Sequence, residues 1–416
     1  MTLSVELSGL QAAQTDLDTI GNNIANVGTN GFKASQANFA DLYGNSLLGS
    51  AGTAGTPGQG VMTSSLSQLF TEGSISTTGN PLNVAINGNG FFQVLTPTGV
   101  AYSRDGSFGL DANGDLVNSA GSFVMGFAAP ASGSTAVAAG TLGKLQVSEA
   151  NVPPTATSTM TMSVNLPSTD KPINTTTTPF SVNTAASYDE STTSTVYDSL
   201  GAPRTLTTYF TEVSGSGAPP KWQTHWALSN TDGTMVASGS GATLSFNSSG
   251  TLTAGTGTIN VATLSDGAAP LSIAQNFTGT TLSDLNFGVN SIQSNGNAAG
   301  QFAGVSIGSN GDVVAQYTNG ATKVMGTVAL VNFTNPQGLT PVSGNNWLAT
   351  VASGQPLTNM PGSGGVGTLE SGAIEGSNVD LSTQLVNLIV AQQAYQANVQ
   401  GVNVDQQDVQ KLMTIQ

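Results

Sequence analysis

The feature that most constrains this chain is a heptad repeat of apolar residues at each of its two ends. The N-terminal repeat alternates spacings of four and three, with gaps at Gln14 and Gly21. Its members are Leu3, Leu7, Leu10, Leu17 and Ile24, and the stripe is widened by Ile20 and Val27. This spacing predicts an amphipathic helix of the coiled-coil type. Because Gly28 can adopt the left-handed conformation, we expect the helix to end near Val27.

The C-terminal repeat keeps one heptad register, with gaps at Gln392 and Gln406. Its members are Leu381, Leu385, Leu388, Tyr395, Val399, Val402, Val409 and Met413. Ser377, with Asp380 three residues on, predicts an N-cap and a helix from about residue 379 nearly to the C-terminus. Each helix alone would leave its apolar stripe in water. We therefore expect the two helices to pack on one another and on copies from other subunits; the alternative is that they pack into an ordinary globular core.

The residues between the two helices follow β patterns. Residues 113–126 contain NGDLV and VMG, and residues 310–326 contain NGDVV and VMG, which suggests one β-domain interrupted by an insertion. The insertion is rich in Thr, Ser, Gly and Ala, and its short strands predict a β-sandwich or barrel. The predicted fold class is mainly β, with a terminal helical coiled coil and a nested multi-domain chain. Its parts are the paired helices (1–32 and 370–416), an extended connector (33–80 and 355–369), an inner β-domain (81–146 and 296–354) and an inserted outer β-domain (147–295).

Charge is scarce in this chain. It has eight Lys and Arg residues against 23 Asp and Glu, a net charge of −15, and only 7% charged residues. The lack of a basic stripe argues against nucleic-acid binding, and an acidic membrane surface would repel the chain. No apolar run reaches 18 residues, so we expect no membrane insertion. A surface this poor in charge is weakly protected against self-association, which favours a polymer; an ordinary secreted β-protein is the alternative.

The sequence also carries few candidates for chemistry. With no cysteine, disulfides and thiolate metal sites are excluded. NGNGFF at 87–92 has no helix pattern after it, so it predicts a hairpin turn and not a phosphate loop. DANGD at 111–115 lacks the later Gly and Glu of a calcium loop and predicts an Asn-Gly hairpin, leaving adventitious calcium open. His225 is the only histidine. We expect no catalytic, metal or cofactor site, and no enzyme.

The stretch IGNNIANVGTNGFKAS, residues 20–35, runs from the first helix into a turn. Its pattern Asn-x-x-Asn-x-x-x-x-Gly-Phe-Lys resembles the N-terminal signature of the bacterial flagellar rod and hook axial proteins. The matching residues are Asn23, Asn26, Gly31, Phe32 and Lys33. Segments 70–94, 101–126 and 367–398 are also similar to that family, and the final heptads complete the set. Together they cover about half of the chain.

The resemblance implies a structural subunit of the flagellar hook. Such a subunit would polymerise into a flexible curved tube, a universal joint that transmits torque from rod to filament. The terminal helices, with the heptad residues as self-assembly sites, would line the tube, and the β-domains would face outward. The chain length and the large insertion favour a hook subunit over the shorter rod proteins. The alternatives are a distal rod or hook-associated axial protein, or a monomeric secreted β-rich adhesin or enzyme.

The same resemblance implies partners and a location. The partners would be further copies of the chain, rod proteins at the proximal end, a hook cap during assembly and hook–filament junction proteins at the distal end. The flagellar type III export apparatus would carry the subunit to the extracellular hook of the basal body. The first basic residue is Lys33, so the start of the sequence lacks the basic region of a secretory signal. We therefore expect export without a cleaved signal peptide.

Overall fold

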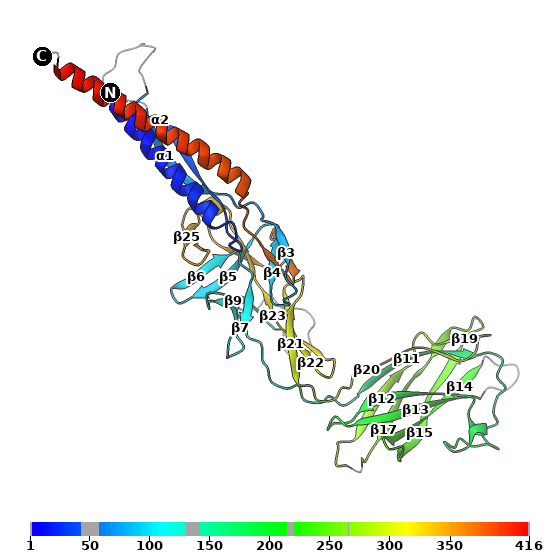
Figure 1. Ribbon diagram of the computed structural model, residues 1–416. Helices are drawn as coiled ribbons and strands as arrows, with labels where there is room; N and C mark the ends of the chain where they lie inside the picture. Colours follow the sequence, from blue (N-terminus) through cyan, green and yellow to red (C-terminus); the bar gives the residue numbers. More distant parts are fainter. Residues whose placement is uncertain (1, 43–57, 130–141, 214–219, 265, 415–416) are drawn as a thin grey trace. The chain divides into compact units, whose positions relative to one another are not determined.

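The computed structural model describes residues 2–42, 58–129, 142–213, 220–264 and 266–414 (Figure 1). The chain forms two compact units. Unit 1 comprises Met1–Glu149, Gly304–Ala315 and Lys323–Gln416, and unit 2 comprises Ala150–Ala303 and Gln316–Thr322. Unit 2 is thus inserted into the sequence of unit 1. The expected fold class, mainly β with paired terminal helices, is confirmed. The predicted domain limits, such as 147–295 for the insertion, stay a prediction.

The two helices of unit 1 are α1 (Thr2–Ala25) and α2 (Leu381–Thr414). Asp380, and not the expected Ser377, caps α2: its Oδ1 accepts the backbone N–H of Ser382 at 2.9 Å and that of Thr383 at 3.4 Å. The Ser377 hydroxyl instead accepts the N–H of Val379, before the helix begins. An aspartate at this position also favours the positive end of the helix dipole. Among the described residues, neither helix is long and apolar enough to span a bilayer.

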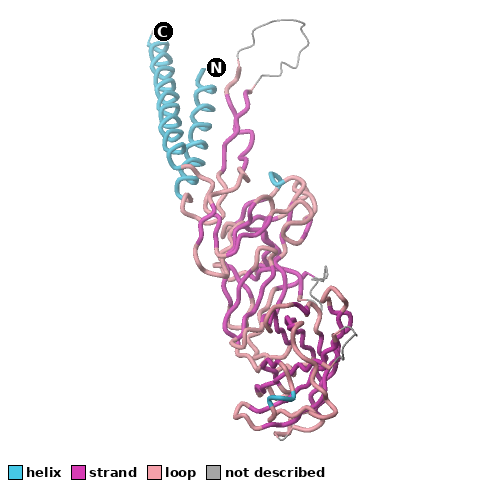
Figure 2. The backbone as a smooth tube through the Cα atoms, turned by 90° about the vertical axis from the view of Figure 1, so that its right-hand side faces the viewer, coloured by secondary structure: helices cyan, strands magenta, loops and turns pink. Residues whose placement is uncertain are grey.

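A β-hairpin covers a second side of α1. It consists of β1 (Ser35–Asp41) and β2 (Val61–Gln68), which pair antiparallel from Ser35↔Gln68 to Asp41↔Val61. In Figure 2 α1 lies between α2 and this hairpin, and both neighbours contact it. The structure therefore differs from the extended connector expected over 33–80. The Gly/Ser/Thr-rich composition hid the pairing, since neither strand has a strong apolar alternation.

The rest of unit 1 is a β body built mainly on one large sheet. Part of that sheet has the strand order β23-β9-β5-β6-β26-β25, while β4 pairs with β28 and β3 with β29. The strands are β3 (Ile75–Thr77), β4 (Val84–Asn87), β5 (Phe91–Thr96), β6 (Gly99–Ser103), β7 (Phe108–Leu110), β8 (Leu116–Asn118), β9 (Phe123–Ala128), β10 (Leu142–Lys144), β23 (Thr322–Val328), β24 (Leu330–Asn332), β25 (Thr340–Val342), β26 (Asn346–Leu348), β27 (Leu357–Asn359), β28 (Thr368–Ser371) and β29 (Ala373–Glu375), with a 3-10 turn η2 (Pro336–Gly338). Two more strands are β21 (Phe302–Ile307) and β22 (Asp312–Tyr317); both cross the division between the units, as β23 does at its first residue, Thr322.

Three turn and repeat motifs of the sequence can be located in this body. The two VMG stretches are neighbours, because β9 and β23 pair antiparallel with Gly126↔Val328 and Gly326↔Ala128. DANGD does join a hairpin, that of β7 and β8. The prediction for NGNGFF was wrong: residues 88–90 link β4, which pairs with β28, to β5 in the large sheet. Local turn chemistry alone does not say which sheet each flanking strand joins.

Unit 2 consists of two sheets. One has the order β17-β18-β11-β19, with β20 also paired to β11, and the other has the order β12-β13-β14-β15-β16. The strands are β11 (Thr159–Pro167), β12 (Glu190–Tyr197), β13 (Pro203–Glu212), β14 (Lys221–Asn230), β15 (Met235–Phe246), β16 (Leu252–Ala254), β17 (Thr256–Val261), β18 (Leu271–Asn276), β19 (Thr281–Ser283) and β20 (Gly288–Ser294), with a 3-10 turn η1 (Ala185–Ser187). Both sheets contribute to one buried core that includes Met162, Phe210, Trp222 and Ile273. The unit is therefore a β-sandwich, one of the two architectures expected.

Candidate self-assembly site

The two terminal helices run antiparallel. Near one end of the pair, the Asn23 amide donates to the Gln384 side chain at 3.4 Å. Toward the other end, Gly9 faces Asn398 so closely that a Cβ on the glycine would lie 2.8 Å from its Oδ1, and Gly401 faces Glu6 in the same way at 2.6 Å. Each glycine therefore makes room for a polar side chain of the other helix. This part of the pair is polar and small, and it is not an apolar zipper.

On α2 the side that faces α1 has its own heptad spacing. The less exposed positions, alternately four and three apart, are Gln384, Leu388, Ala391, Tyr395, Asn398, Val402 and Asp405. Among the predicted self-assembly residues, Leu388, Tyr395, Val399 and Val402 are half-buried, whereas the others are exposed: Leu381 by 42%, Leu385 by 45%, Val409 by 56% and Met413 by 75%. Only part of the predicted stripe is thus covered within one chain, because the helix turns polar residues such as Gln384 and Asn398 toward its partner.

The predicted residues of α1 divide in the same way. Ile20 is 5% exposed, and Leu10, Leu17 and Ile24 are half-buried. Leu7 is 51% exposed, and Val27, two residues beyond the end of α1, is 37% exposed. The side chain of Leu3 lies outside the described residues. The buried face of α1 also includes Ala12, Ala13 and Thr19.

One group of exposed apolar residues lies near the start of α2, whereas Val404, Val409 and Met413 are exposed farther along it. Val386, Ile389 and Val390 are 55–60% exposed, and Leu385 borders them. Val386 lies three residues before Ile389 and four before Val390, so the three side chains lie on one side of the helix, away from Leu388 and Ala391. We call these four residues the α2 stripe. An apolar stripe of this kind is a candidate surface for another protein chain, because each side chain would gain about 1.5–3 kcal/mol on complete burial.

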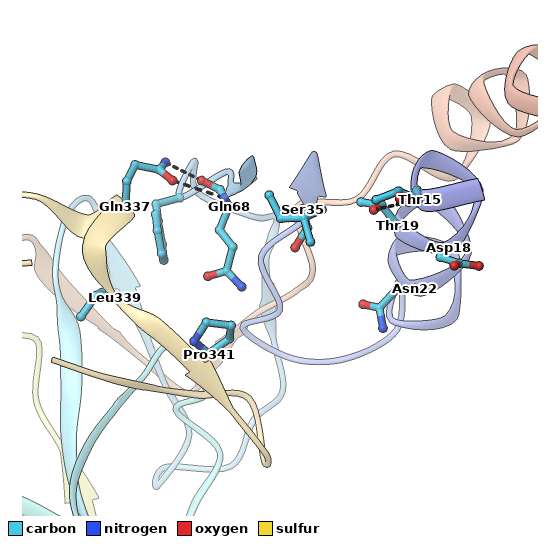
Figure 3. A pocket seen from close by; sticks show the side chains of 11 residues that line it. Thr15, Asp18, Thr19, Asn22, Ser35, Gln68, Gln337, Leu339 and Pro341 are labelled. Carbon is cyan, nitrogen blue, oxygen red and sulfur yellow. Dashed lines mark hydrogen bonds between the residues drawn. The ribbon is translucent and has the colours of Figure 1, made fainter. Parts of the chain in front are cut away.

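An open pocket of about 450 Å³ lies between α1 and the β body (Figure 3). On one wall α1 presents polar side chains, including Thr15, Asp18 and Asn22. The opposite wall is more apolar, with Leu339 and Pro341. The Gln337 side chain closes the rim by donating to the carbonyl of Gln68 at 2.6 Å and accepting its N–H at 3.3 Å. This pocket, like the α2 stripe, is not covered by any other described part of unit 1.

The signature turn fixes the end of α1 to the β body. The Asn23 side chain bridges back to Ser35, accepting its N–H at 2.9 Å and donating to its carbonyl at 2.8 Å. Asn26 caps the preceding turn through the carbonyl of Asn22. Phe32 is half-buried. Gly31 has φ +65°, and a Cβ there would lie 2.5 Å from the backbone carbon of Arg104. The glycine of the signature is therefore required by both conformation and space.

A buried cluster of three charged side chains lies directly beneath this turn. Glu375, at the end of β29, receives Lys33 Nζ on Oε1 at 2.5 Å and Arg104 Nη1 on Oε2 at 3.1 Å. The side chains of all three are at most 3% exposed. Two further hydrogen bonds reach the triad: Lys33 donates to the Thr71 carbonyl at 2.7 Å, and the Gly73 N–H donates to Glu375 at 3.0 Å. We call Lys33, Arg104 and Glu375 the ion triad.

Burial and neighbouring charges act on the members of the ion triad in opposite directions. Burial lowers the pKa of the Lys33 ammonium, since a charge loses its hydration, while Glu375 raises it and Arg104 lowers it further. Two buried cations around one carboxylate leave a net positive charge, which the carbonyls of Thr71 and Gly88 partly offset. A second tie runs in parallel, because the Gly31 N–H donates to the backbone carbonyl of Glu375 at 2.8 Å. The N-terminal turn, β6 and the strand before α2 are thus joined at one point.

The sequence did not identify Arg104 and Glu375 as members of a site. Lys33 stands 71 residues from Arg104 and 342 from Glu375, so no local spacing relates them. The sequence offered only a weak signal for this site: Lys33 is one of only eight Lys and Arg residues in the chain. Among the described residues, no group of three or more His, Asp or Glu side chains is placed to hold a metal ion. His225 lies on the face of β14 opposite Trp222, stacked on Phe180 at 4.1 Å.

Replacing Lys33 with Met should destabilise unit 1 by about 3 kcal/mol, because it removes the charged donor that the buried Glu375 Oε1 and the Thr71 carbonyl both accept. Glu375→Gln should cost more, since two buried cations then lose their counter-charge. Lys411→Met is the matched control. The side chains of Lys411 and Asp408 are 72% and 63% exposed, so the ion pair between them should contribute less than about 0.5 kcal/mol to stability. Urea unfolding of the full chain measures these differences. Equal effects of the Lys33 and Lys411 changes would contradict the buried pairing.

Gly31→Ala should weaken unit 1 and loosen the end of α1, because the new Cβ meets the backbone at Arg104 and the residue has positive φ. Gly28→Ala is the control in the same turn: nothing lies within 4 Å of its Cβ position. The thermal midpoint and the protease sensitivity of residues 26–34 report the effect. If both alanine variants behave alike, the close approach at Gly31 is not limiting.

Comparisons with known proteins cover every part of this arrangement. Family models match in chain order: "Flagella basal body rod protein" over residues 3–33, "Flagellar hook protein FlgE/F/G D1 domain" over 85–166, "Flagellar basal body protein FlaE D2 domain" over 165–297, and "Flagellar basal body rod FlgEFG protein C-terminal" over 370–415. The first and last matches contain the two helices. The N-terminal match ends at Lys33, and the C-terminal one includes Glu375.

Curated relatives align over the full length. Flagellar hook protein FlgE of Salmonella typhimurium is 38% identical over 420 residues, which is 100% of both chains. The Escherichia coli FlgE is 37% identical with the same coverage, and that of Brucella abortus is 33% identical over 94% of this chain and 93% of its own. A rod protein, FlgG of Buchnera aphidicola, is 45% identical but covers only 29% of this chain and 50% of its own.

A solved structure shares the fold. The crystal structure of Helicobacter pylori flagellar hook protein FlgE2 superposes with a TM-score of 0.53, covering 71% of this chain and 99% of that one, at 14% identity. The full-length identity to the hook proteins, the matched domain models and the paired terminal helices agree with one another. The chain belongs to the flagellar hook protein family.

Proposed function

We propose that this chain is the structural subunit of a flagellar hook and that it polymerises into a flexible curved tube joining rod to filament. The observation that carries the proposal is the full-length identity to hook proteins together with the α2 stripe, which one chain leaves uncovered. In the polymer, other copies would cover the stripe and the remaining heptad residues of both helices. The role is structural and not catalytic.

The arrangement of covered and uncovered residues supports a mechanical role. The ion triad fixes the helical pair to the β body within each subunit, so torque applied to the helices would reach the body through buried ionic contacts. Contacts between subunits would rely on exposed apolar and neutral polar side chains, in a chain with only 7% charged residues. Such contacts are weakly directional and can shift with little change in energy, which allows a tube to bend while rotating.

We also propose the partners and the route of the subunit. Rod proteins would contact the tube at its proximal end, junction proteins at its distal end, and a cap during growth. The flagellar type III apparatus would export the chain to the extracellular hook without cleaving a signal peptide. One observation supports export without cleavage: the segment matched by the rod-protein model contains α1, and cleavage after this segment would remove one of the two paired helices.

The intact mass of subunits from purified hooks tests export without cleavage. A mass that lacks α1 would contradict it.

Val386→Asp should abolish polymerisation while leaving the subunit folded, because Val386 is 60% exposed in the single chain but would be buried between copies. A buried unpaired carboxylate costs several kcal/mol, enough to prevent association. The matched control is Asn403→Asp, which adds the same charge at an exposed position farther along α2, outside the stripe. Electron microscopy under polymerising conditions and sedimentation measure the outcome.

Three results would separate the alternatives. Polymers of normal length from the Val386→Asp chain would contradict assembly through the α2 stripe. A wild-type chain that remains a monomer under all polymerising conditions would favour a secreted adhesin or enzyme. Labelled subunits located in the rod or at the filament junction of isolated basal bodies would favour a distal rod or hook-associated protein. The 29% coverage of this chain by the rod relative argues against the first of these positions.

A further inference from the structure

Unit 2 contains a group of four carboxylates that the proposed hook function does not use. They are Asp170, Asp189, Glu190 and Glu212. Asp170 and Asp189 belong to the segment 168–189 that connects β11 to β12, Glu190 begins β12, and Glu212 ends β13. Glu212 is only 8% exposed. We call these four residues the carboxylate cluster.

Two carboxylate oxygens of the cluster are buried without a partner. Glu212 Oε2 and Asp170 Oδ2 accept no hydrogen bond from any described residue. A buried ionised oxygen without a donor is costly, whereas a protonated one can donate to a neighbouring carboxylate. Protonation of Glu212 therefore removes a buried charge that the neighbouring acids would otherwise repel.

Basic residues do not neutralise this cluster. Lys171 follows Asp170, and Lys221 begins β14 beside the strand end, but both are exposed. Among the described residues, neither forms an ion pair with the four acids. The other titratable groups packed against the segment are aromatic: Tyr188 contacts Tyr209, and His225 stacks on Phe180. Burial lowers the pKa of His225, so it supplies no positive charge near neutral pH.

Backbone hydrogen bonds of the same region are made at the residues that carry these charges. The Ile173 N–H donates to the Glu212 carbonyl at 2.9 Å, and the Glu212 N–H donates to Asp189 Oδ2 at 2.8 Å. The Asp189 N–H in turn donates to the Phe210 carbonyl at 2.9 Å. These bonds attach the segment 168–189 to the end of β13. Repulsion between Glu212 and the acids of the segment acts directly against them.

Burial, and then the charges of Asp189 and Asp170, raise the pKa of Glu212 to about 7. The pKa values of Asp189 and Glu190 are also raised, each mainly by burial. The folded state therefore binds a proton that the opened state releases near the ordinary glutamate value of 4.5. Stability from this site is fully present below pH 4.5 and is lost as pH rises through about 7.

We propose that the carboxylate cluster is a proton-binding site that controls the segment 168–189. One proton, held by Glu212 and its acidic neighbours, keeps the segment on β13. Loss of that proton leaves the buried Glu212 negatively charged beside its half-buried acidic neighbours, and the segment detaches. Detachment would expose the ring faces of Phe180 and His225, so the surface of unit 2 changes with the pH of its surroundings.

Hydrogen exchange of the full chain, corrected for the intrinsic rate at each pH, tests this proposal. Peptides within 168–189 should exchange on the order of tenfold faster at pH 8.5 than at pH 5.5, as expected for opening linked to release of the Glu212 proton. Glu212→Gln imitates the protonated acid and should keep the segment protected at both pH values. Asp170→Asn removes one repelling charge and should move the midpoint to lower pH.

The control is Asp232→Asn, a change in the exposed turn between β14 and β15 that should leave the pH dependence unchanged. The proposal is overturned if wild-type protection is equal at the two pH values. It is also overturned if Glu212→Gln retains the wild-type response, or, should that variant not fold, if Asp170→Asn leaves the midpoint in place. Polymerisation is measured separately, so failure of this proposal and failure of the hook function give different results.

Discussion

The buried contact between Glu375 and its two cations, Lys33 and Arg104, is the interaction on which the rest of unit 1 depends. It brings together the turn after α1, the end of β6 and the strand that leads to α2. Because a lone buried charge is far more costly than a paired one, the three segments have one low-energy arrangement. The helices therefore emerge from the β body at a fixed place, and their antiparallel pairing follows from where each one starts and ends.

The same unit separates contacts satisfied inside one chain from those left for other chains. Where α1 meets α2, the interface combines Leu388, Ala391, Tyr395 and Val402 with glycines and with polar side chains such as Gln384 and Asn398. The α2 stripe and the pocket beside α1 remain open. A subunit that folds and then assembles benefits from this division, since a separate apolar core around Phe91, Val331 and Trp347 stabilises the β body while the α2 stripe stays available.

Sequence reasoning anticipated the elements of the site better than their relations. The heptads located both helices, and the signature located Gly31 and Lys33. Periodicity could not show that Leu385 faces outward while Gln384 faces α1, because a 3.5-residue repeat gives a stripe but not its partner. It also missed the β1–β2 hairpin, whose strands are rich in Ser, Gln and Asn, and the destination of the strands around NGNGFF.

What the sequence by itself determined is local: two amphipathic ends, β-structure between them, an inserted section of different composition, and family signatures that imply a hook subunit. Only the tertiary structure decided which residues meet: Lys33 with Glu375 across 342 positions, and Glu212 with Asp189. The physical reason is that periodicity and turn chemistry reflect interactions within a few residues. Burial of a charge, by contrast, depends on every segment that excludes water from it, wherever those segments lie in the chain.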